Sequence, residues 1–197
     1  MLKKMSDPAL DEVFISSTPA FEGRLLHVHV DKVRLPNGRT TTREMADHQG
    51  AIAVVPVLPD GSIIFVKQFR YPMGTVMYEL PAGKIDPGED KDVCAVRELS
   101  EETGYEADNW EYLGAIATTP GFTNEVIYLY AATGLHRHAQ HTDPDEFITV
   151  EAIPREKILP MIEEGILYDA KSLAALGILS MKGKCNKFNK APAGDSS

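Results

Sequence analysis

The sequence predicts a mixed α/β (α+β) protein, and three observations support this. Short apolar or alternating runs, bounded by Gly, Pro, Asn and Asp, recur before residue 155 and predict strands. One stretch without Pro or Gly, residues 90–103, predicts a helix after the first several strands. Two further helices are expected over residues 155–164 and 169–182, opened by a proline and an aspartate. Because strands and helices are interspersed, a mixed fold is favoured over an all-β sandwich.

The N-terminal part is expected to form an antiparallel β subdomain. Residues 1–10 have no periodic pattern, and residues 12–48 have the character of extended chain. Apolar and polar residues alternate over residues 26–31, which is the period of a strand with one buried face. Asn-Gly at residues 37–38 predicts a hairpin turn, with the return strand over residues 40–44.

The middle of the chain predicts a more apolar sheet. Residues 51–58 and 62–69 are two apolar strands joined by a tight Pro-Asp-Gly turn. A short strand is expected over residues 76–80, and Pro-Ala-Gly at residues 81–83 is expected to break it. Further strands are expected over residues 111–118, 124–132 and 147–152.

Length and charge restrict the classes of function. The chain has 197 residues, 43% of them hydrophobic, which suits one main core. It carries 20 Lys and Arg against 29 Asp and Glu, a net charge of −9. This charge disfavours binding to nucleic acid or to anionic membranes. Two cysteines without a paired pattern, no 18-residue apolar run and no signal-peptide pattern predict a cytoplasmic protein.

Acidic residues gather in residues 83–105, GKIDPGEDKDVCAVRELSEETGY, where seven acids and three bases give a net charge of −4. Glu98, Glu101 and Glu102 share one helix face in the last turn, where like charges repel and the helix dipole is unfavourable to acids. Two interpretations of this face are open, a solvated acidic surface or a site for hard divalent cations. Val93, Val96 and Leu99 are expected to be core residues of the same helix.

The spacing within this segment resembles the signature of the Nudix hydrolases, Gly-x5-Glu-x7-Arg-Glu-aliphatic-x-Glu-Glu-x-Gly. The resemblance implies a Nudix fold, a mixed-sheet α/β/α sandwich, with a loop–helix–loop cradle for a diphosphate. It also implies two or three Mg²⁺ ions per active site, with Mn²⁺ as a possible substitute. The positions that match are Gly83, Glu89, Arg97, Glu98, Leu99, Glu101, Glu102, Gly104 and Tyr105.

Roles within the segment follow from the same resemblance. Arg97 and Glu101 are expected to take part in catalysis, and Glu89 is expected to pair with Arg97 and orient the helix. Gly83 and Gly104 are expected in turns that need a positive φ. The expected metal ligands are the carbonyl of Ala82 and the carboxylates of Glu98, Glu101 and Glu102.

Segments outside the signature are similar to the ADP-ribose pyrophosphatase subgroup of the family. The main marker is Pro120, fifteen residues after Tyr105, within TTPGFTNE at residues 118–125. For Arg43 and Arg70 a surface or interface ion pair is an equally open interpretation, although the planar guanidinium suits phosphate. The resemblance suggests substrate contacts at Arg43, Arg70, Glu79, Pro120 and Gly121.

The polar loop over residues 140–146 supplies the candidate general base. In the resembling enzymes a glutamate from this loop closes over the site, which corresponds to Glu146 here. The alternative is a solvated loop acid, and Asp143 and Asp145 are the other candidates in the loop.

The predicted organisation has three parts. Residues 1–48 form the N-terminal β subdomain, which the resemblance suggests is exchanged in a homodimer. Residues 49–183 form the hydrolase domain, and residues 184–197 form a disordered tail. The predicted activity is Mg²⁺-dependent hydrolysis of ADP-ribose to AMP and ribose 5-phosphate. The alternatives are a broader nucleoside-diphosphate-sugar hydrolase, for example of GDP-mannose, and a non-catalytic nucleotide-sensing Nudix module.

Overall fold

A computed structural model describes residues 2–139 and 147–183. The predicted tail and the loop that carries Glu146, Asp143 and Asp145 therefore lie outside the described residues. The chain divides into two compact units, one of residues 1–50 with 117–126 and one of residues 51–116 with 127–197. Among the helices of the described part, none combines the length and the apolar character needed to cross a membrane.

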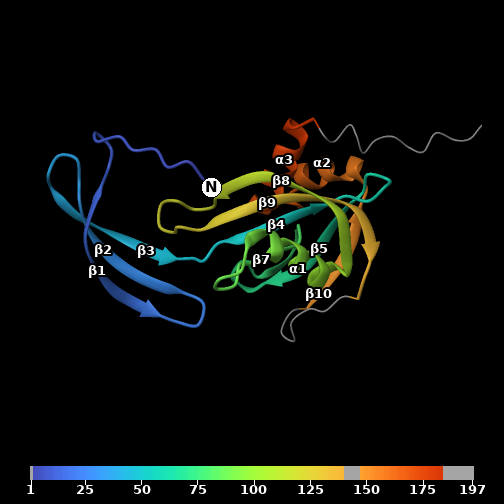
Figure 1. The fold of residues 1–197 in the computed structure, drawn as a ribbon. Coiled ribbons are helices and arrows are strands. Elements are labelled where there is room, and N and C mark those ends of the chain that lie inside the picture. Colours follow the sequence, from blue (N-terminus) through green and yellow to red (C-terminus); the bar gives the residue numbers. More distant parts are fainter. Residues whose placement is uncertain (1, 140–146, 184–197) are drawn as a thin grey trace, which may run out of the picture. The chain divides into compact units, whose positions relative to one another are not determined.

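The first unit is built on a three-stranded antiparallel sheet (Figure 1). Its strands are β1 (Val13–Glu22), β2 (His27–Arg34) and β3 (Thr40–Asp47), paired in the order β1-β2-β3. The predicted hairpin lies between β2 and β3, where Gly38 has a φ of 82° that favours glycine. The expected antiparallel pairing of residues 26–34 with the return strand is confirmed by the register, in which Val30 faces Glu44.

This sheet buries little of its own apolar surface. Val33 is its one buried hydrophobic residue among the described strands, and every position of β1 is exposed. The large hydrophobic side chains exposed on β1 and on the β1–β2 turn are Val13, Phe14, Ile15, Phe21, Leu25 and Leu26. A three-stranded sheet gains independent stability only when such a face is covered.

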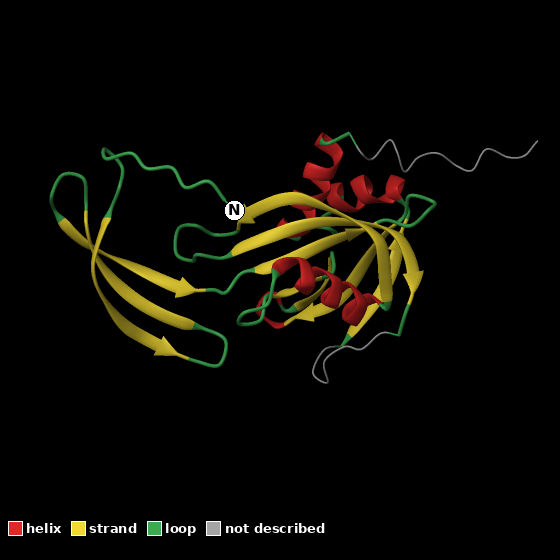
Figure 2. Cartoon of the chain, in the orientation of Figure 1, coloured by secondary structure: helices red, strands yellow, loops and turns green. Residues whose placement is uncertain are grey.

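The described residues of the second unit form two sheets and three helices (Figure 2). One sheet has the order β7-β4-β9-β8, formed by β7 (Ala82–Lys84), β4 (Ala51–Pro56), β9 (Val126–Arg137) and β8 (Tyr105–Ala117). The other has the order β10-β5-β6, formed by β10 (Ile148–Ile153), β5 (Ile63–Arg70) and β6 (Thr75–Glu79). The helices are α1 (Lys91–Thr103), α2 (Arg155–Glu163) and α3 (Ala170–Met181), with a 3-10 turn at Tyr71–Met73.

Strand β4 lies at the centre of this unit because both of its faces are apolar. Ile52 and Val54 pack in a cluster with Leu99 of α1, whereas Ala53 and Val55 pack in a second cluster. The second cluster includes residues of β5, α2 and α3. Figure 1 shows α1 on one side of β4, and α2 and α3 on the other. The predicted α/β/α sandwich is therefore confirmed.

Several boundaries differ from those expected. The Pro-Ala-Gly segment does end β6, but Ala82 and the two residues after it form β7 by pairing with residues 51–53 of β4. Strand β8 begins at Tyr105, directly after α1, and not at residue 111. The two apolar strands β4 and β5 are joined by the expected tight turn, yet they share one bridge, Val57 with Ile63, and then enter different sheets.

Candidate active site

Helix α1 carries the acidic face, and its two ends are fixed by ordinary capping. The carboxylate of Asp90 accepts a hydrogen bond from the backbone N–H of Asp92, which is an N-cap contact. Gly104 ends the helix with a φ of 66°, in the left-handed region, and its N–H donates to the carbonyl of Ser100. The positive φ predicted for Gly104 is confirmed.

The face of α1 that turns inward differs from the expected one. Cys94, Ala95 and Leu99 are fully buried, whereas Val93 is 60% exposed and Val96 is 47% exposed. The expectation that the two valines are core residues was therefore wrong. The small residues at 94 and 95 let the helix approach β4 closely, and this orientation also turns carboxylates inward, since Glu98 and Glu102 lie on the same side as Leu99.

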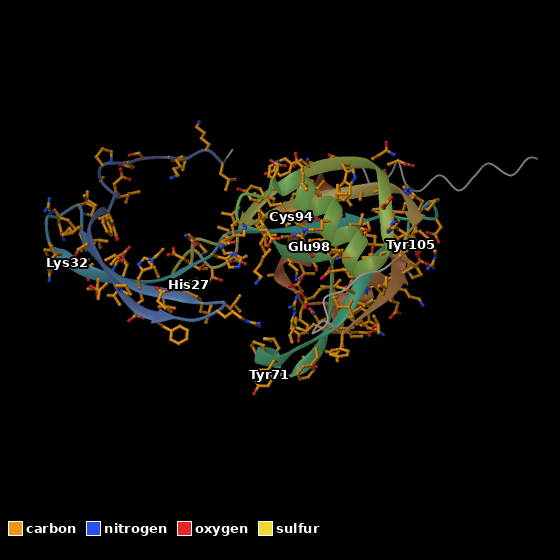
Figure 3. All side chains as sticks on the ribbon, turned by 60° about the horizontal axis from the view of Figure 1, so that its bottom comes forward. His27, Lys32, Tyr71, Cys94, Glu98 and Tyr105 are labelled. Atoms are coloured by element: carbon orange, nitrogen blue, oxygen red, sulfur yellow. The ribbon has the colours of Figure 1, made fainter. Side chains whose placement is uncertain are left out.

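Gly83 provides the space for one of these carboxylates. A Cβ atom at Gly83 would lie within 3.0 Å of all three atoms of the Glu98 carboxylate. Gly83 is not among the glycines with a positive φ, so the predicted reason for this glycine was wrong. The residue is glycine because the Glu98 carboxylate packs directly against its Cα. Figure 3 shows where Glu98 lies on α1.

A second carboxylate is fixed by the residue that precedes Gly83 in β7. Glu102 is only 5% exposed, and its Oε2 accepts a hydrogen bond of 2.9 Å from the backbone N–H of Ala82. The adjacent carbonyl of Pro81 accepts a bond from the N–H of Val54 in β4. The segment before the helix is therefore fixed both to the central strand and to the acidic face.

Arg97 joins the remaining acids of the segment. Its Nε and Nη2 donate to the two oxygens of Glu89 at 2.9 and 3.0 Å, as the sequence predicted for this pair. Its Nη1 donates to Glu98 at 2.8 Å and to Glu101 at 2.9 Å. The Arg97 guanidinium, with a further bond from the N–H of Asp86, lowers the pKa of Glu89 to about 2. The single guanidinium of Arg97 thus reduces the repulsion between carboxylates that would destabilise this face of the helix by themselves.

The donor set of this face suits a hard divalent cation. Glu98, Glu101 and Glu102 offer carboxylate oxygens on successive turns, and β7 adds the backbone carbonyl of Ala82. Within residues 2–139 and 147–183, no three acidic, His or Cys side chains already converge on one point. Oxygen donors of this kind fit Mg²⁺, which keeps several of its waters and is bound through carboxylates together with substrate phosphates.

Two of the predicted substrate residues lie together in a partly buried ion cluster. Arg70 of β5 donates through Nε and Nη2 to the two oxygens of Glu79 at 2.6 and 2.8 Å. Lys171 of α3 also pairs with Glu79 and, at 3.0 Å, with Asp169. Burial raises the pKa of Glu79, but the two cations outweigh it, so that the pKa lies below its usual value. Glu79 is consequently an ionised carboxylate enclosed by protein groups.

The other predicted substrate residues belong to the first unit. Arg43 pairs with Glu12 through two hydrogen bonds within that unit. Pro120 and Gly121 lie in the loop over residues 117–126, and the carbonyl of Phe122 in this loop accepts a bond of 2.7 Å from the N–H of Ala46. The loop that carries the proline marker is therefore attached to the end of β3.

The loop has three further contacts, with the last residue of β3 and with the residue that follows it. The side chain of Asn124 accepts a bond from the N–H of His48 and donates to Asp47. The imidazole of His48 lies 3.3 Å from the carboxylate of Glu125. These contacts were not foreseen, because nothing in either short segment indicates the other as its partner.

The geometry can be compared with known proteins. A model of the NUDIX domain matches residues 47–176, which is more than half of the chain. The chain belongs to the Nudix family. A second model, the nucleoside diphosphate sugar hydrolase N-terminal domain, matches residues 14–45, the strands of the first unit. Nudix ADP-ribose pyrophosphatases generally use a divalent metal ion.

Curated relatives of this Nudix chain cover most of its length. It is 41% identical over 174 residues to the methanol dehydrogenase activator of Bacillus methanolicus, covering 87% of this chain and 94% of the relative. It is 39% identical over 176 residues to the ADP-ribose pyrophosphatase of Bacillus subtilis, covering 88% and 95%. A GDP-mannose pyrophosphatase of Yersinia enterocolitica is 30% identical over 152 residues, covering 72% and 78%.

A solved structure shows the same fold. The crystal structure of an ADP compounds hydrolase superposes with a TM-score of 0.82 at 20% identity, and the match covers 94% of this chain and all of the other. At this identity the likeness concerns the fold alone. The Nudix fold and the N-terminal sheet expected from the sequence are both present in this chain.

Proposed function

We propose that the protein hydrolyses the diphosphate of ADP-ribose to AMP and ribose 5-phosphate with Mg²⁺. The observation that carries the proposal is the acidic face of α1, in which Glu98 packs on Gly83 and Glu102 bonds to Ala82. The substrate is supported by the relative from Bacillus subtilis, an ADP-ribose pyrophosphatase that is 39% identical over 88% of the chain. The Pro120 marker of the sequence agrees with this choice.

The residues proposed to hold Mg²⁺ are Glu98, Glu101, Glu102 and the carbonyl of Ala82, with two or three ions per site. Mn²⁺ is expected to replace Mg²⁺ because both prefer oxygen donors. When bound, these cations neutralise the diphosphate and lower the pKa of a coordinated water. The net charge of −4 in this segment, which would repel a diphosphate by itself, supports the need for them.

The chain's own residues have the task of placing the reacting groups. Arg97 holds Glu98 and Glu101 in position, because one guanidinium nitrogen bonds to both. Glu146 is the proposed general base, which accepts a proton as a water oxygen bonds to phosphorus. The bond from that phosphorus to the bridging oxygen breaks, and the bridging oxygen leaves on the other phosphate. Glu146 lies outside the described part of the chain, so its proposed role rests on its place in the sequence.

Substrate contacts are proposed for Arg43, Arg70, Glu79, Pro120 and Gly121. The support is strongest for Arg70. Glu79 fixes two nitrogens of the Arg70 guanidinium, while the Arg70 side chain stays 42% exposed. The planar guanidinium can then present its remaining nitrogen to a phosphate or a ribose hydroxyl. For Arg43, the ion pair with Glu12 agrees equally with a structural role.

A cytoplasmic homodimer with exchanged N-terminal sheets is also part of the proposal. It is supported by the exposed apolar side chains of β1 and by the match of these strands to a separate N-terminal domain model. The hairpin of β5 and β6 exposes apolar side chains as well, and Figure 3 shows Tyr71 at its tip. Surfaces of this kind mark sites of protein association. Sedimentation of the chain, with and without residues 1–48, tests the dimer.

Turnover of a panel of substrates tests the activity. ADP-ribose, GDP-mannose, UDP-glucose and a dinucleotide are compared with Mg²⁺, with phosphatase-coupled phosphate release as the readout. ADP-ribose is expected to have the highest kcat/KM. A clear preference for another nucleotide sugar would overturn the substrate, though not the reaction class. The Glu146→Gln variant is expected to lower kcat with little change in Mn²⁺ affinity, and an unchanged kcat would remove Glu146 from the mechanism.

Two other functions have specific support. The GDP-mannose pyrophosphatase relative favours a broader sugar-nucleotide hydrolase, which the same panel distinguishes. The relative named methanol dehydrogenase activator favours a module that regulates a partner enzyme. A purely sensing module would keep its effect on a partner in the Glu102→Gln variant. A hydrolase is expected to lose several orders of magnitude in kcat in that variant.

A further inference from the structure

The first turn of α3 contributes a buried cation to the cluster around Glu79. The Glu79 side chain is 4% exposed and that of Lys171 is 12% exposed, so that their ion pair is largely shielded from solvent. Lys171 also pairs with Asp169, which caps α3 by accepting the backbone N–H of Ser172. Two carboxylates and two cations, including Arg70, thus balance in one partly buried network.

The same turn also binds the backbone beside Glu79. The hydroxyl of Ser172, which is fully buried, donates to Asp169 at 2.5 Å and accepts a bond of 2.8 Å from the N–H of Leu80. Neighbouring residues of α3 therefore hold neighbouring residues at the end of β6. Lys171 holds the side chain of Glu79, the last residue of β6, and Ser172 holds the backbone of Leu80, the residue after it.

The contact of Ser172 with Leu80 lies two residues before Ala82, the residue whose backbone bonds to the acidic face of α1. Leu80 is followed by Pro81, whose carbonyl bonds to Val54, and by Ala82, whose N–H bonds to the Glu102 carboxylate. A shift of Leu80 would be transmitted through this short, hydrogen-bonded segment to Ala82 and Glu102. The turn of α3 is far from α1 in sequence but is connected to its carboxylates through the short segment that joins β6 to β7.

We propose that Lys171 and Ser172 are positioning residues of the active site, acting on substrate and metal respectively. Lys171 shares Glu79 with Arg70, so that the guanidinium is held through Nε and Nη2 in one orientation. Ser172 fixes the segment from Leu80 to Ala82, and with it the carbonyl and the carboxylate of the metal-binding face. The inference for Lys171 rests on the proposed function, whereas that for Ser172 requires only that the face binds divalent cations.

The geometry explains why each group suits its task. Removal of Lys171 would leave Glu79 and Asp169 with Arg70 as their nearest cation, and Arg70 would be drawn further toward them. Nη1 of Arg70, which has no hydrogen-bond partner among the described residues, would then be displaced from its present direction. Removal of the Ser172 hydroxyl would leave the buried N–H of Leu80 without its acceptor, which is unfavourable unless the strand moves.

The test of Ser172 compares Ser172→Ala and Ser172→Thr with Ser180→Ala, an exposed serine of the same helix. Mn²⁺ binding to each folded protein is measured by electron paramagnetic resonance without substrate. Ser172→Ala is expected to weaken Mn²⁺ binding about 10-fold or more, as loss of a group that orients metal ligands does. The hydroxyl of threonine is expected to restore most of the affinity, and Ser180→Ala should bind Mn²⁺ as the wild type does.

The test of Lys171 uses Lys171→Met and Lys171→Arg, with Lys182→Met as the control for loss of a surface lysine. Lys171→Met is expected to raise KM for ADP-ribose about 10-fold while Mn²⁺ affinity changes much less, and arginine is expected to restore KM in part. Wild-type KM in Lys171→Met would overturn the role of Lys171. If Lys171→Met does not fold, a wild-type KM in Lys171→Gln, which keeps a polar group at the site, would overturn it equally.

Two outcomes separate this inference from the proposed function. If the wild-type protein does not hydrolyse ADP-ribose, the function is wrong, but the Mn²⁺ measurement still decides the role of Ser172. If Ser172→Ala keeps wild-type Mn²⁺ affinity, the role of Ser172 is wrong whatever the substrate. A lower melting temperature with unchanged Mn²⁺ affinity and unchanged KM would show that the turn is structural only, and would overturn both assignments.

Discussion

Replacement of Gly83 by alanine is expected to disable the site without unfolding the protein. The Cβ of alanine would lie within 3.0 Å of the Cδ and both oxygens of Glu98. The Cδ atom and one oxygen of Glu98 would lie only 2.0 Å from that Cβ. Ordinary contact between carbon atoms begins at about 3.5 Å, so the carboxylate must retreat by roughly 1.5 Å. The backbone itself accepts alanine, because Gly83 is not in the positive-φ region. The perturbation is therefore confined to the position of one carboxylate.

The size of the effect follows from that displacement. A misplacement of about 1 Å in a catalytic arrangement can lower the rate about 100-fold. This corresponds to about 2.7 kcal/mol of transition-state stabilisation. Glu98 also shares Arg97 with Glu89 and Glu101, so its retreat is expected to disturb the rest of the acidic face. We therefore expect kcat/KM to fall about 100-fold and Mn²⁺ binding to weaken.

The assay is phosphate release with Mg²⁺ and ADP-ribose, together with a thermal melt. Gly177→Ala is the matched control, because a Cβ at Gly177 meets nothing within 4 Å and alanine favours the interior of α3. That control should keep full activity and gain a little stability. Wild-type kcat/KM in Gly83→Ala would refute the claim that the close approach of Glu98 to Gly83 matters for the reaction. A loss of activity that only follows unfolding would refute it as well.

Two other predictions concern stability. Arg97 lowers the pKa of Glu89 to about 2, so this contact stabilises the folded state above the ordinary pKa of 4.5 and is lost as the pH falls toward 2. Glu89→Gln should therefore flatten the decline of melting temperature between pH 5 and 2, and an unchanged slope would contradict this. The hydroxyl of Tyr130 donates to Asp92 at 2.5 Å, so Tyr130→Phe should cost about 1 kcal/mol and lower Tm by about 3 °C. The matched control is Tyr71→Phe, at a side chain that is 88% exposed, and it should leave Tm unchanged. Equal melting temperatures for the wild type, Tyr130→Phe and Tyr71→Phe would refute the role of the Tyr130 bond.

Much of the fold could be predicted from local pattern, and the errors have physical causes. The Asn-Gly hairpin and the helix ending at Gly104 were correct, because glycine at a positive φ is specified locally. The three-residue strand at Ala82 was missed, since it exists only because β4 offers it a partner. Val93 and Val96 were assigned to the core because they form an apolar pair, whereas the buried face is formed by Cys94 and its neighbours. Hydrophobicity alone did not reveal that small residues allow the closer packing.

The candidate site divides in a similar way between local and distant contacts. The resemblance to the Nudix signature was enough to predict the contact of Arg97 with Glu89, and the structure contains it. The contacts of Lys171 and Ser172 could not be predicted, because the segment before α3 indicates only that Asp169 caps a helix. Their partners lie about 90 residues earlier in the chain. The metal and substrate roles of the predicted residues remain predictions for the experiments above.

Strand β4 offers a way to measure binding without turnover. All six of its residues are buried, and it is hydrogen-bonded on one edge to β7 and on the other to β9. Amides in such a position exchange with deuterated solvent only when the whole unit opens. A ligand that binds only the folded unit slows this opening in proportion to its concentration over its Kd. Deuterium uptake in residues 51–55 can therefore rank nucleotide sugars by affinity, even for a variant that hydrolyses none of them.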